Sequence, residues 1–477
     1  MRNLTMMTDF YQLTMANGYF QNDEKNVEAV FDLFFREGDK ISYCISAGLE
    51  QAVEYLLNLE FTDSDIEFLD TLGYFTADFL QYLKTFKFTG DLYAMPEGTV
   101  VFPNEPILTI KAPIIEAQIV ETALLTIINH QTLIATKTAK VKSACGGDSL
   151  LEFGLRRAQG ADAGNYGARA AMIGGADGTS NVFLAKKYNL DPKGTHSHSW
   201  VMSFNHEIDA FREYARLYPD KCLLLVDTYD TLASGVPNAI EVFKELKANG
   251  YKPVGIRLDS GDLAYLSKKA RILLDEAGFE DAKICASSDL DEHLIMSLKQ
   301  QGAKIDMWGV GTKMITSYDL PALGGVYKMS AISQNGKLVP KIKISNNMIK
   351  ITNPALKTVQ RIYNKKNNMA LADLITLKGE TFDGSPLEIF HPVETWKRMV
   401  ITDYTMRDLH ETVIENGELK KPLPTFEETI EYAKCERNSI WDEYKRLYNP
   451  ENYKVDLSEN LHTIKTDILK SIAKKMK

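Results

Sequence analysis

The chain contains 477 residues, of which 44% are hydrophobic and 25% are charged, and it carries a net charge of −9. This composition is typical of a globular protein of two or three domains. The negative charge, with no basic run beyond the terminal KSIAKKMK, argues against nucleic acid as a partner.

The cysteines and the apolar segments suggest a cytoplasmic protein. The five cysteines include no C-x-x-C pair: Cys44, Cys145, Cys222, Cys285 and Cys435. Such an odd, unpatterned set indicates reduced thiols. The opening residues, MRNLTMMTDFYQ, contain no apolar stretch typical of a secretory signal. The most apolar segment, 113–144, is interrupted by Glu116 and Glu121, so we expect a buried helix there and no membrane span.

The first part of the chain predicts a mixture of helices and strands. We expect a helix within 8–20, a strand at 27–36 and several helices over 47–85. Short strands broken by Gly and Pro follow over 90–113, and a long helix is expected at 114–143.

From about residue 149 the pattern changes to short strands that alternate with helices. The expected strands lie at 149–154, 222–227, 252–259, 282–288 and 305–311. The expected helices lie at 203–217, 234–249, 262–278 and 291–301. Repeated β–α units predict a parallel sheet, either doubly wound or closed into a (β/α) barrel.

Polar residues at the ends of these strands favour the barrel. Asp227, Asp259, Ser287 and Thr312 each lie at or just beyond the end of an expected strand. Barrel enzymes collect their active-site groups at the C-terminal ends of the strands. Each residue alone fits a helix cap equally well, but four consecutive loops of this kind indicate the rim of an active site.

Beyond the barrel, the sequence predicts further strands and then helices. Strand-like segments begin at GGVYKMSAIS, turn at QNGK and continue to about residue 352. Residues 401–477 are charged and largely helical in pattern, without recognisable chemistry.

The segment KGTHSHSWVMSF, 193–204, contains two of the eight histidines of the chain, His196 and His198. On a strand, an H-x-H pair would suit a transition metal, but the later strand ends contain no histidine to complete the site. As a nucleophile, one imidazole would need a carboxylate, such as Asp227 or Asp230, to accept its Nδ1–H and leave Nε2 free. An ordinary structural histidine remains the third interpretation.

A glycine-rich turn follows the last expected strand. In GVGTKM, 309–314, Gly309 and Gly311 would let backbone N–H groups approach a phosphate. The spacing matches neither a P-loop nor G-x-G-x-x-G, and glycine turns after strands are common.

Three arginines are candidates for binding anions. Arg156 and Arg157 follow Phe153 and can offer forked donors to phosphates, or else form surface ion pairs. Arg257 lies within an apolar strand, where an unpaired charge is costly, so it should pair with Asp259 or face an anion in a pocket. Asp259 is in turn suited to ribose hydroxyls or Mg²⁺.

Six blocks in order resemble the nicotinate phosphoribosyltransferase family: TDFYQLTMANGYF, EFGLRRAQG, GTHSHSWVMSF, LLLVDTYDTLASGVPNAI, GIRLDSGDL and VGTKMITSYDLPALGGVYKM. The resemblance runs from about residue 5 to 330. It implies an irregular α/β barrel, here 149–329, joined to a mixed α+β domain from 1–148 and 330–400, with 401–477 as a helical extension.

The resemblance also implies an activity. The family makes nicotinate mononucleotide and pyrophosphate from nicotinate and 5-phosphoribosyl 1-pyrophosphate, in NAD salvage. It couples this reaction to ATP hydrolysis through a phosphohistidine, requires Mg²⁺, and commonly works as a homodimer with shared active sites.

Carried over by position, the resemblance implies roles for individual residues. His198 matches the phosphorylated histidine, and Asp227 is its candidate partner. The residues that match nicotinate contacts are Tyr11, Phe153, Thr195 and Arg257, with Tyr11 contributed by the partner subunit. Thr312 matches a phosphoribosyl-binding residue, and Arg156, Arg157 and Asp259 are expected to hold phosphate and ribose. Gly309 and Gly311 remain candidates for phosphate from the glycine turn itself. The chain has Ser197 where the family usually has alanine, a change that is conservative in size.

Other functions remain to be distinguished. Nicotinamide phosphoribosyltransferases share this layout, whereas quinolinate phosphoribosyltransferases are shorter and use no phosphohistidine. A metal-dependent barrel hydrolase and a non-catalytic phosphosugar-binding barrel are the alternatives from other classes. Arg257 would favour nicotinate, because a guanidinium selects a carboxylate over a neutral amide.

Overall fold

The computed structural model describes residues 3–36, 38, 41–345, 351–382, 384 and 386–475. The chain forms two compact units. Unit 1 comprises Met1–Leu133 and Ala322–Lys477, and unit 2 comprises Ile134–Pro321. The boundaries differ from those expected at 149 and 329. The first observed boundary, between Leu133 and Ile134, lies within the long helix α6 (Glu121–Cys145). Part of the strand-like segment expected up to residue 352, residues 346–350, lies outside the described residues.

Unit 1 is built on a seven-stranded antiparallel sheet with the order β13-β12-β1-β5-β3-β19-β20. Its strands are β1 (Glu28–Phe35), β3 (Asp91–Ala94), β5 (Leu108–Pro113), β12 (Gly325–Gln334), β13 (Lys337–Pro340), β19 (Glu411–Glu415) and β20 (Glu418–Leu419). β1 lies within the sheet and is buried along nearly its whole length, in keeping with its mostly apolar sequence EAVFDLFF, in which Asp32 is the one buried charge.

A second sheet of unit 1 has the order β18-β14-β15-β21. Its strands are β14 (Lys357–Asn364), β15 (Ala370–Leu377), β18 (Tyr404–Asp408) and β21 (Val455–Leu457). Two small ladders pair β2 (Cys44–Ile45) with β4 (Val100–Val101), and β16 (Leu387–Phe390) with β17 (Arg398–Ile401). Residues 401–477 thus contribute strands to both sheets, which corrects the expectation of a separate helical extension.

The second sheet is tied to its helical cover by a buried ion cluster. Arg361 on β14 is fully buried, and its guanidinium bonds Asp373 at 2.6 and 2.8 Å and Glu436 at 3.0 Å. Nη2, one of the two nitrogens that bond Asp373, also donates to the carbonyl oxygen of Val100 at 2.6 Å. Every charge of this cluster therefore has a partner, as burial requires.

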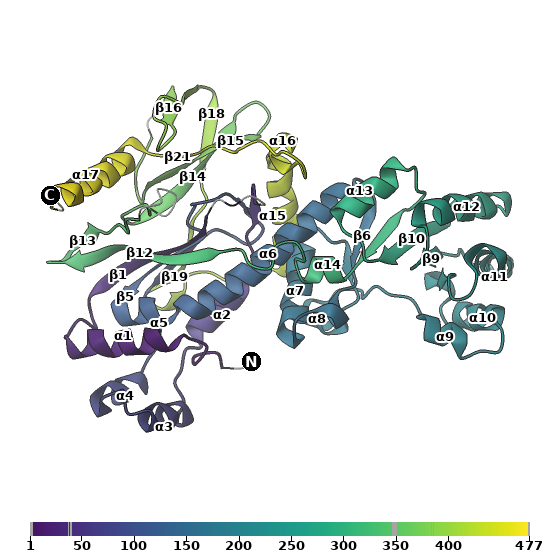
Figure 1. Cartoon of the computed structure of the whole chain (residues 1–477), viewed down its shortest axis with the longest axis horizontal. Coiled ribbons are helices and arrows are strands. Elements are labelled where there is room, and N and C mark those ends of the chain that lie inside the picture. The colour runs from purple at the N-terminus through teal and green to yellow at the C-terminus, as the bar shows by residue number, and fades with distance from the viewer. Residues whose placement is uncertain are drawn as a thin grey trace. The chain divides into compact units, whose positions relative to one another are not determined.

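Helices of unit 1 accompany these sheets (Figure 1). They are α1 (Phe10–Gln21), α2 (Leu49–Leu57), α3 (Asp63–Thr71), α4 (Ala77–Leu83), α5 (Ile114–Ile119), α15 (Phe426–Ser439), α16 (Asp442–Lys445) and α17 (Glu459–Lys475). The long helix expected at 114–143 is confirmed as α5 and α6 with a break between them. Within the described parts of the chain, no helix is long and apolar enough to cross a membrane.

Unit 2 contains the predicted β–α alternation. Its six-stranded parallel sheet has the order β7-β6-β11-β10-β9-β8. The strands are β6 (Ser149–Glu152), β7 (Gly178–Thr179), β8 (Leu223–Leu225), β9 (Gly255–Leu258), β10 (Lys283–Ser288) and β11 (Met307–Val310). The helices are α7 (Ala161–Gly174), α8 (Val182–Tyr188), α9 (His198–Met202), α10 (Glu207–Leu217), α11 (Val236–Ala248), α12 (Leu263–Glu276), α13 (Glu292–Gln300) and α14 (Thr312–Ile315), with short turns η1 (Leu155–Arg157), η2 (Pro219–Lys221) and η3 (Thr231–Gly235).

The parallel sheet of unit 2 does not close into a barrel among the described residues, because β7 and β8 remain its two edges. The irregular segment 189–197, which precedes α9, lies between these two edge strands instead. The N–H of Lys193 donates to the carbonyl oxygen of Thr179 on β7 at 2.8 Å. The N–H of Leu225 on β8 donates to Nε2 of His196 at 3.2 Å. The mixed α/β class is therefore confirmed, but a coil segment stands where a barrel would need another strand.

Candidate active site

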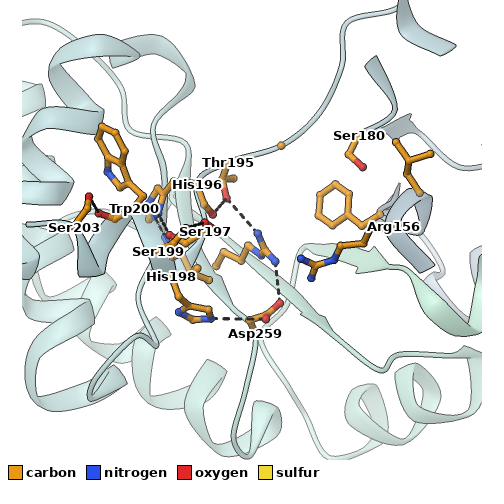
Figure 2. A pocket seen from close by; sticks show the side chains of 15 residues that line it. Arg156, Ser180, Thr195, His196, Ser197, His198, Ser199, Trp200, Ser203 and Asp259 are labelled. Atoms are coloured by element: carbon orange, nitrogen blue, oxygen red, sulfur yellow. Dashed lines mark hydrogen bonds and ion pairs between the residues drawn. The ribbon is translucent and has the colours of Figure 1, made fainter. Parts of the chain in front are cut away.

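Unit 2 contains a cavity of about 870 Å³ beside the C-terminal ends of its strands. Fifteen residues line it: Phe153, Leu155, Arg156, Ser180, Gly194, Thr195, His196, Ser197, His198, Ser199, Trp200, Ser203, Leu225, Arg257 and Asp259. Figure 2 shows His198 and Asp259 on one side of the cavity and Arg156 and Ser180 on the other. Six of the residues that the sequence analysis assigned to the site thus meet in one cavity: Phe153, Arg156, Thr195, His198, Arg257 and Asp259.

Arg257 is a largely buried cation of this cavity, held by hydrogen bonds. Its side chain is 17% exposed and projects from β9. Nε donates to Ser287 Oγ at 2.7 Å, and Nη2 donates to Asp259 Oδ1 at 2.9 Å. Nη1 has a longer contact, 3.4 Å, with Thr195 Oγ1. Two sides of the guanidinium are therefore held, and the Nη1 side remains available to an anion.

Phe153 forms the apolar wall beside this cation. The guanidinium carbon of Arg257 lies 5.7 Å from the centre of the Phe153 ring, within the range of a cation–π contact. A Cβ atom at Gly309 would lie 2.6 Å from that ring, and one at Gly311 would lie 3.0 Å from the carbonyl oxygen of Phe153. Both glycines thus make room for Phe153, a role that the sequence analysis did not foresee.

Asp259 joins Arg257 to His198. Burial raises the pKa of its carboxyl group, but the hydrogen bond from Ser287 and the charge of Arg257 outweigh burial and lower that pKa below its ordinary value. Oδ2 of Asp259 faces Nε2 of His198 at 3.9 Å, as the dashed line in Figure 2 marks. Asp259 is therefore an anion that lies between the guanidinium of Arg257 and the ring of His198.

His198 is the first residue of α9, and its side chain is 39% exposed. Its Nδ1 lies 3.1 Å from Thr228 Oγ1. Neither Asp227 nor Asp230, the carboxylates proposed from the sequence for Nδ1, bonds this ring. Thr228 takes that position because the chain turns after β8 and brings the side chain next to Asp227 towards α9.

Asp227 instead organises the loop after β9. Its Oδ2 accepts hydrogen bonds from the N–H of Asp259 at 2.9 Å and from Ser260 Oγ at 2.6 Å. Its Oδ1 is buried and has no hydrogen-bond partner. Asp227 therefore influences His198 by positioning Asp259. Its Oδ1 remains available to accept a hydrogen bond from a bound ligand or to bind an ion.

His196 differs from His198 in its burial and in its hydrogen-bond partners. Its side chain is buried, and its ring packs edge-on against Tyr214 at 4.8 Å. Burial lowers the pKa of His196 to about 4. A neutral ring is required here because Nε2 accepts the Leu225 N–H at the open edge of the sheet. His196 is thus a structural histidine, one of the three interpretations left open by the sequence.

The two rings do not converge on a common point. Nε2 of His196 is occupied by the Leu225 N–H, whereas His198 faces Thr228 and Asp259. Across the residues that the structure describes, no group of three or more His, Cys, Asp or Glu side chains could hold a metal ion. The H-x-H pair therefore has the geometry of two separate histidines.

Several other predicted residues lie apart from the cavity lining. Arg157 is exposed at the end of η1, and Thr312 is the first residue of α14. Tyr11 belongs to α1 of unit 1, where it is 49% exposed. Their proposed ligand contacts remain predictions.

The structure adds contacts that the sequence did not indicate. Ser287 bonds both Arg257 and Asp259, and Thr228 bonds His198. Ser287, near the end of β10, was expected at the rim of the site, and Thr228 follows β8, but nothing in the sequence indicated their partners. Ser180 and Trp200 line the cavity without any preceding signal.

Comparison with known proteins agrees with this geometry. Family models described as the N-terminal domain, the family itself and the C-terminal domain of nicotinate phosphoribosyltransferase match residues 6–129, 149–371 and 356–465. Nicotinate phosphoribosyltransferase of Bacillus subtilis is 50% identical over 461 residues, covering 96% of this chain and 94% of the relative. The Dictyostelium discoideum enzyme of the same name is 36% identical over 514 residues, covering 96% and 86%.

A solved structure is similar over nearly the whole length. The crystal structure of human nicotinic acid phosphoribosyltransferase superposes with a TM-score of 0.84 at 28% identity, covering 97% of this chain and 99% of that one. Sequence, fold and the grouping of Arg257, Phe153 and His198 in one cavity therefore lead to one assignment. The chain belongs to the nicotinate phosphoribosyltransferase family.

Proposed function

We propose that the protein converts nicotinate and 5-phosphoribosyl 1-pyrophosphate to nicotinate mononucleotide and pyrophosphate, with coupled ATP hydrolysis, in NAD biosynthesis. The observation that carries this proposal is the pairing of Arg257 with Phe153 in the cavity of unit 2. A held guanidinium beside an aromatic ring fits a flat, aromatic carboxylate.

Arg257 would select nicotinate through its Nη1 side. A carboxylate can accept a charge-assisted hydrogen bond there, with Thr195 Oγ1 nearby at 3.4 Å from Nη1. A neutral amide would gain much less from the same guanidinium. Departure of pyrophosphate leaves positive character at the ribose C1, which the pyridine nitrogen attacks. The protein contributes chiefly by positioning the two reactants.

His198 is the proposed phosphate carrier. A ring that donates Nδ1–H to Thr228 keeps the Nε2 lone pair free. Nε2 then forms a bond to the γ-phosphorus of ATP while the bond from that phosphorus to the bridging oxygen breaks, and ADP leaves. Hydrolysis of the N–P bond returns inorganic phosphate and the original ring.

Phosphorylation would act on nicotinate recognition through Asp259. The new group adds nearly two negative charges at an atom that lies 3.9 Å from the Asp259 carboxylate. Because like charges repel, the contact between His198 and Asp259 would break. Asp259 also bonds Arg257, so phosphorylation of His198 would affect the guanidinium through two contacts, His198 with Asp259 and Asp259 with Arg257. This chain of contacts is our hypothesis for ATP coupling.

Mg²⁺ is the cofactor that the family implies, and the donor set fits it. Asp227 and Asp259 are carboxylates at the ends of adjacent strands, and Asp227 Oδ1 is a buried oxygen without a partner. Hard oxygen donors of this kind suit Mg²⁺, with substrate phosphates as the other ligands. Bound there, the ion would neutralise charge on the pyrophosphate.

The remaining expectations complete the proposal. Arg156 would bind phosphate from the opposite side of the cavity, with Arg157 and Thr312 as further candidates. Tyr11 would stack on the pyridine from the partner subunit of a homodimer with shared active sites. We place the enzyme in the cytoplasm, as the unpatterned cysteines of the sequence suggest.

A direct substrate comparison tests the reaction. The protein is incubated with 5-phosphoribosyl 1-pyrophosphate and either nicotinate or nicotinamide, with and without ATP, and the mononucleotide products are quantified. We expect product from nicotinate and stimulation by ATP. Preference for nicotinamide would instead establish the amide-using relative, and ligand binding without turnover would indicate a non-catalytic barrel.

The phosphohistidine is tested with variants and [γ-³²P]ATP. His198→Ala should lose the label, the ATPase activity and the stimulation by ATP, while slow uncoupled transfer remains. His206→Ala, at an exposed histidine before α10, is the matched control and should retain all three. His196→Ala should also keep the label. Undiminished ATP coupling in His198→Ala would refute the assignment, and loss of the label only in His196→Ala would move the role to His196.

A further inference from the structure

Unit 1 contains a second cavity, also of about 870 Å³, which the proposed reaction does not use. The elements that line it include β1, β14, β21, the β16–β17 ladder and α17. A volume of this size suits a small organic molecule rather than a simple ion. Its walls carry both buried charges and apolar side chains, which together restrict the kind of ligand that fits.

One buried ion pair at this cavity is fully matched. Lys357 and Asp32 are both nearly inaccessible, and Nζ of the lysine lies 2.7 Å from Asp32 Oδ2. Asp32 Oδ1 accepts a further hydrogen bond from Thr109 Oγ1 at 2.7 Å. Both carboxylate oxygens of Asp32 are therefore engaged by partners within the chain.

Lys465 on α17 is the second lysine. Its Nζ donates to Asn353 Oδ1 at 2.8 Å and has no carboxylate partner within the described part of the chain. Burial, and secondarily the charge of Lys357, lower the pKa of Lys465 from 10.5 to about 8. Lys465 is partly buried, and its ammonium group has a neutral amide as hydrogen-bond partner and the charge of Lys357 nearby. This arrangement is unfavourable, and a bound anion would relieve it.

Two other cations at the cavity have carboxylate partners. Lys397 pairs with Glu394, and Arg398 pairs with Glu388 at 2.7 Å. Lys454 is exposed, and its Nζ contacts Met399 Sδ at 3.3 Å. Burial raises the pKa of Asp456, while the charges of His391 and Lys454 act against that rise. Lys465 is therefore the more enclosed of the two lysines for which the described residues supply no carboxylate.

The apolar part of the cavity supplies the second feature. Phe102 and Tyr453 stack with their ring centres 3.8 Å apart and their planes within 9°. Met399 and Val393 line the same cavity, and Val393 is 57% exposed. These side chains would cover an apolar or aromatic body next to the charge of Lys465.

We propose that this cavity of unit 1 is a binding site for an anionic metabolite with an apolar or aromatic body, whose carboxylate or phosphate group pairs with Lys465. Asn353 orients the ammonium group. The site would be separate from the candidate active site, because the two cavities share no lining residue.

Pyridoxal 5′-phosphate is a suitable probe, because it combines a phosphate, an aromatic ring and an aldehyde. The aldehyde condenses with an uncharged lysine amine and releases water, and borohydride then reduces the imine to a stable secondary amine. After reduction and proteolysis, mass spectrometry locates the label. We expect the full-length protein to label Lys465 about tenfold or more over Lys470, a lysine of the same helix whose side chain is 70% exposed.

Two controls separate binding from mere reactivity of the amine. Pyridoxal, which lacks the phosphate, should label Lys465 far less than pyridoxal 5′-phosphate does. Excess inorganic phosphate should protect Lys465 if phosphate is the recognised group, and benzoate should protect it if an aromatic carboxylate is. Equal labelling by both aldehydes, no preference over Lys470, or no protection by either anion would overturn the proposal. Lys465→Met should remove saturable binding of the probe, measured by equilibrium dialysis, and unchanged binding would also overturn it.

Discussion

Acid should loosen the segment that carries His198, and His196 should be the group responsible. The folded protein holds His196 neutral, with a pKa of about 4 against 6.5 for the free side chain. Between these values the unfolded or locally opened chain binds more protons than the closed one, so stability rises with pH. The stability that depends on a neutral His196 is fully present above about pH 6.5 and is lost as the pH falls towards 4.

The size of this effect follows from the two pKa values. They predict a loss of about 2 kcal/mol by pH 5 and about 3 kcal/mol by pH 4, relative to pH 7. The structural event is protonation of Nε2, which removes the acceptor of the Leu225 N–H. His196→Gln places an amide oxygen at a similar reach, can accept the same hydrogen bond and does not titrate.

Hydrogen exchange followed by mass spectrometry measures the effect locally. The free energy of opening is determined for the peptide that contains Leu225, from pH 7 to pH 5, in the wild type and in His196→Gln. The difference in the free energy of opening between the two proteins should change by about 2 kcal/mol over this range, because the other titrating groups affect both proteins equally. Parallel profiles would refute the role of His196. His196→Phe, which lacks the acceptor, should open more easily by about 1–3 kcal/mol at pH 7.

Three further substitutions test the site and the fold. Arg257→Lys should raise KM for nicotinate roughly 10- to 100-fold in steady-state assays, with a smaller effect on kcat, because the held fork is lost. Gly309→Ala should also raise KM, because its Cβ would lie 2.6 Å from the Phe153 ring; an unchanged KM would show that the ring can shift freely. Arg361→Met should cost about 3–5 kcal/mol in urea unfolding, because Asp373 and Glu436 would stay buried without their cation.

The sequence alone determined the class of the fold and the character of the site residues. Alternating apolar strands and helices require a parallel sheet, and unit 2 has one. A charged Arg257 within an apolar strand had to be paired or aimed at an anion, and it is paired with Asp259. These conclusions depend on local pattern and on the cost of burying charge, which act at the level of single strands.

Only the tertiary structure decided which side chains meet. His196 bonds an edge strand 29 residues away, His198 faces Thr228 rather than the adjacent Asp227, and Gly309 makes room for Phe153. Sequence periodicity predicts which face of an element a residue occupies, but it contains no information on the neighbour across a turn or between strands. The two histidines of THSHSW therefore look alike in the sequence, and the open edge of the sheet distinguishes them.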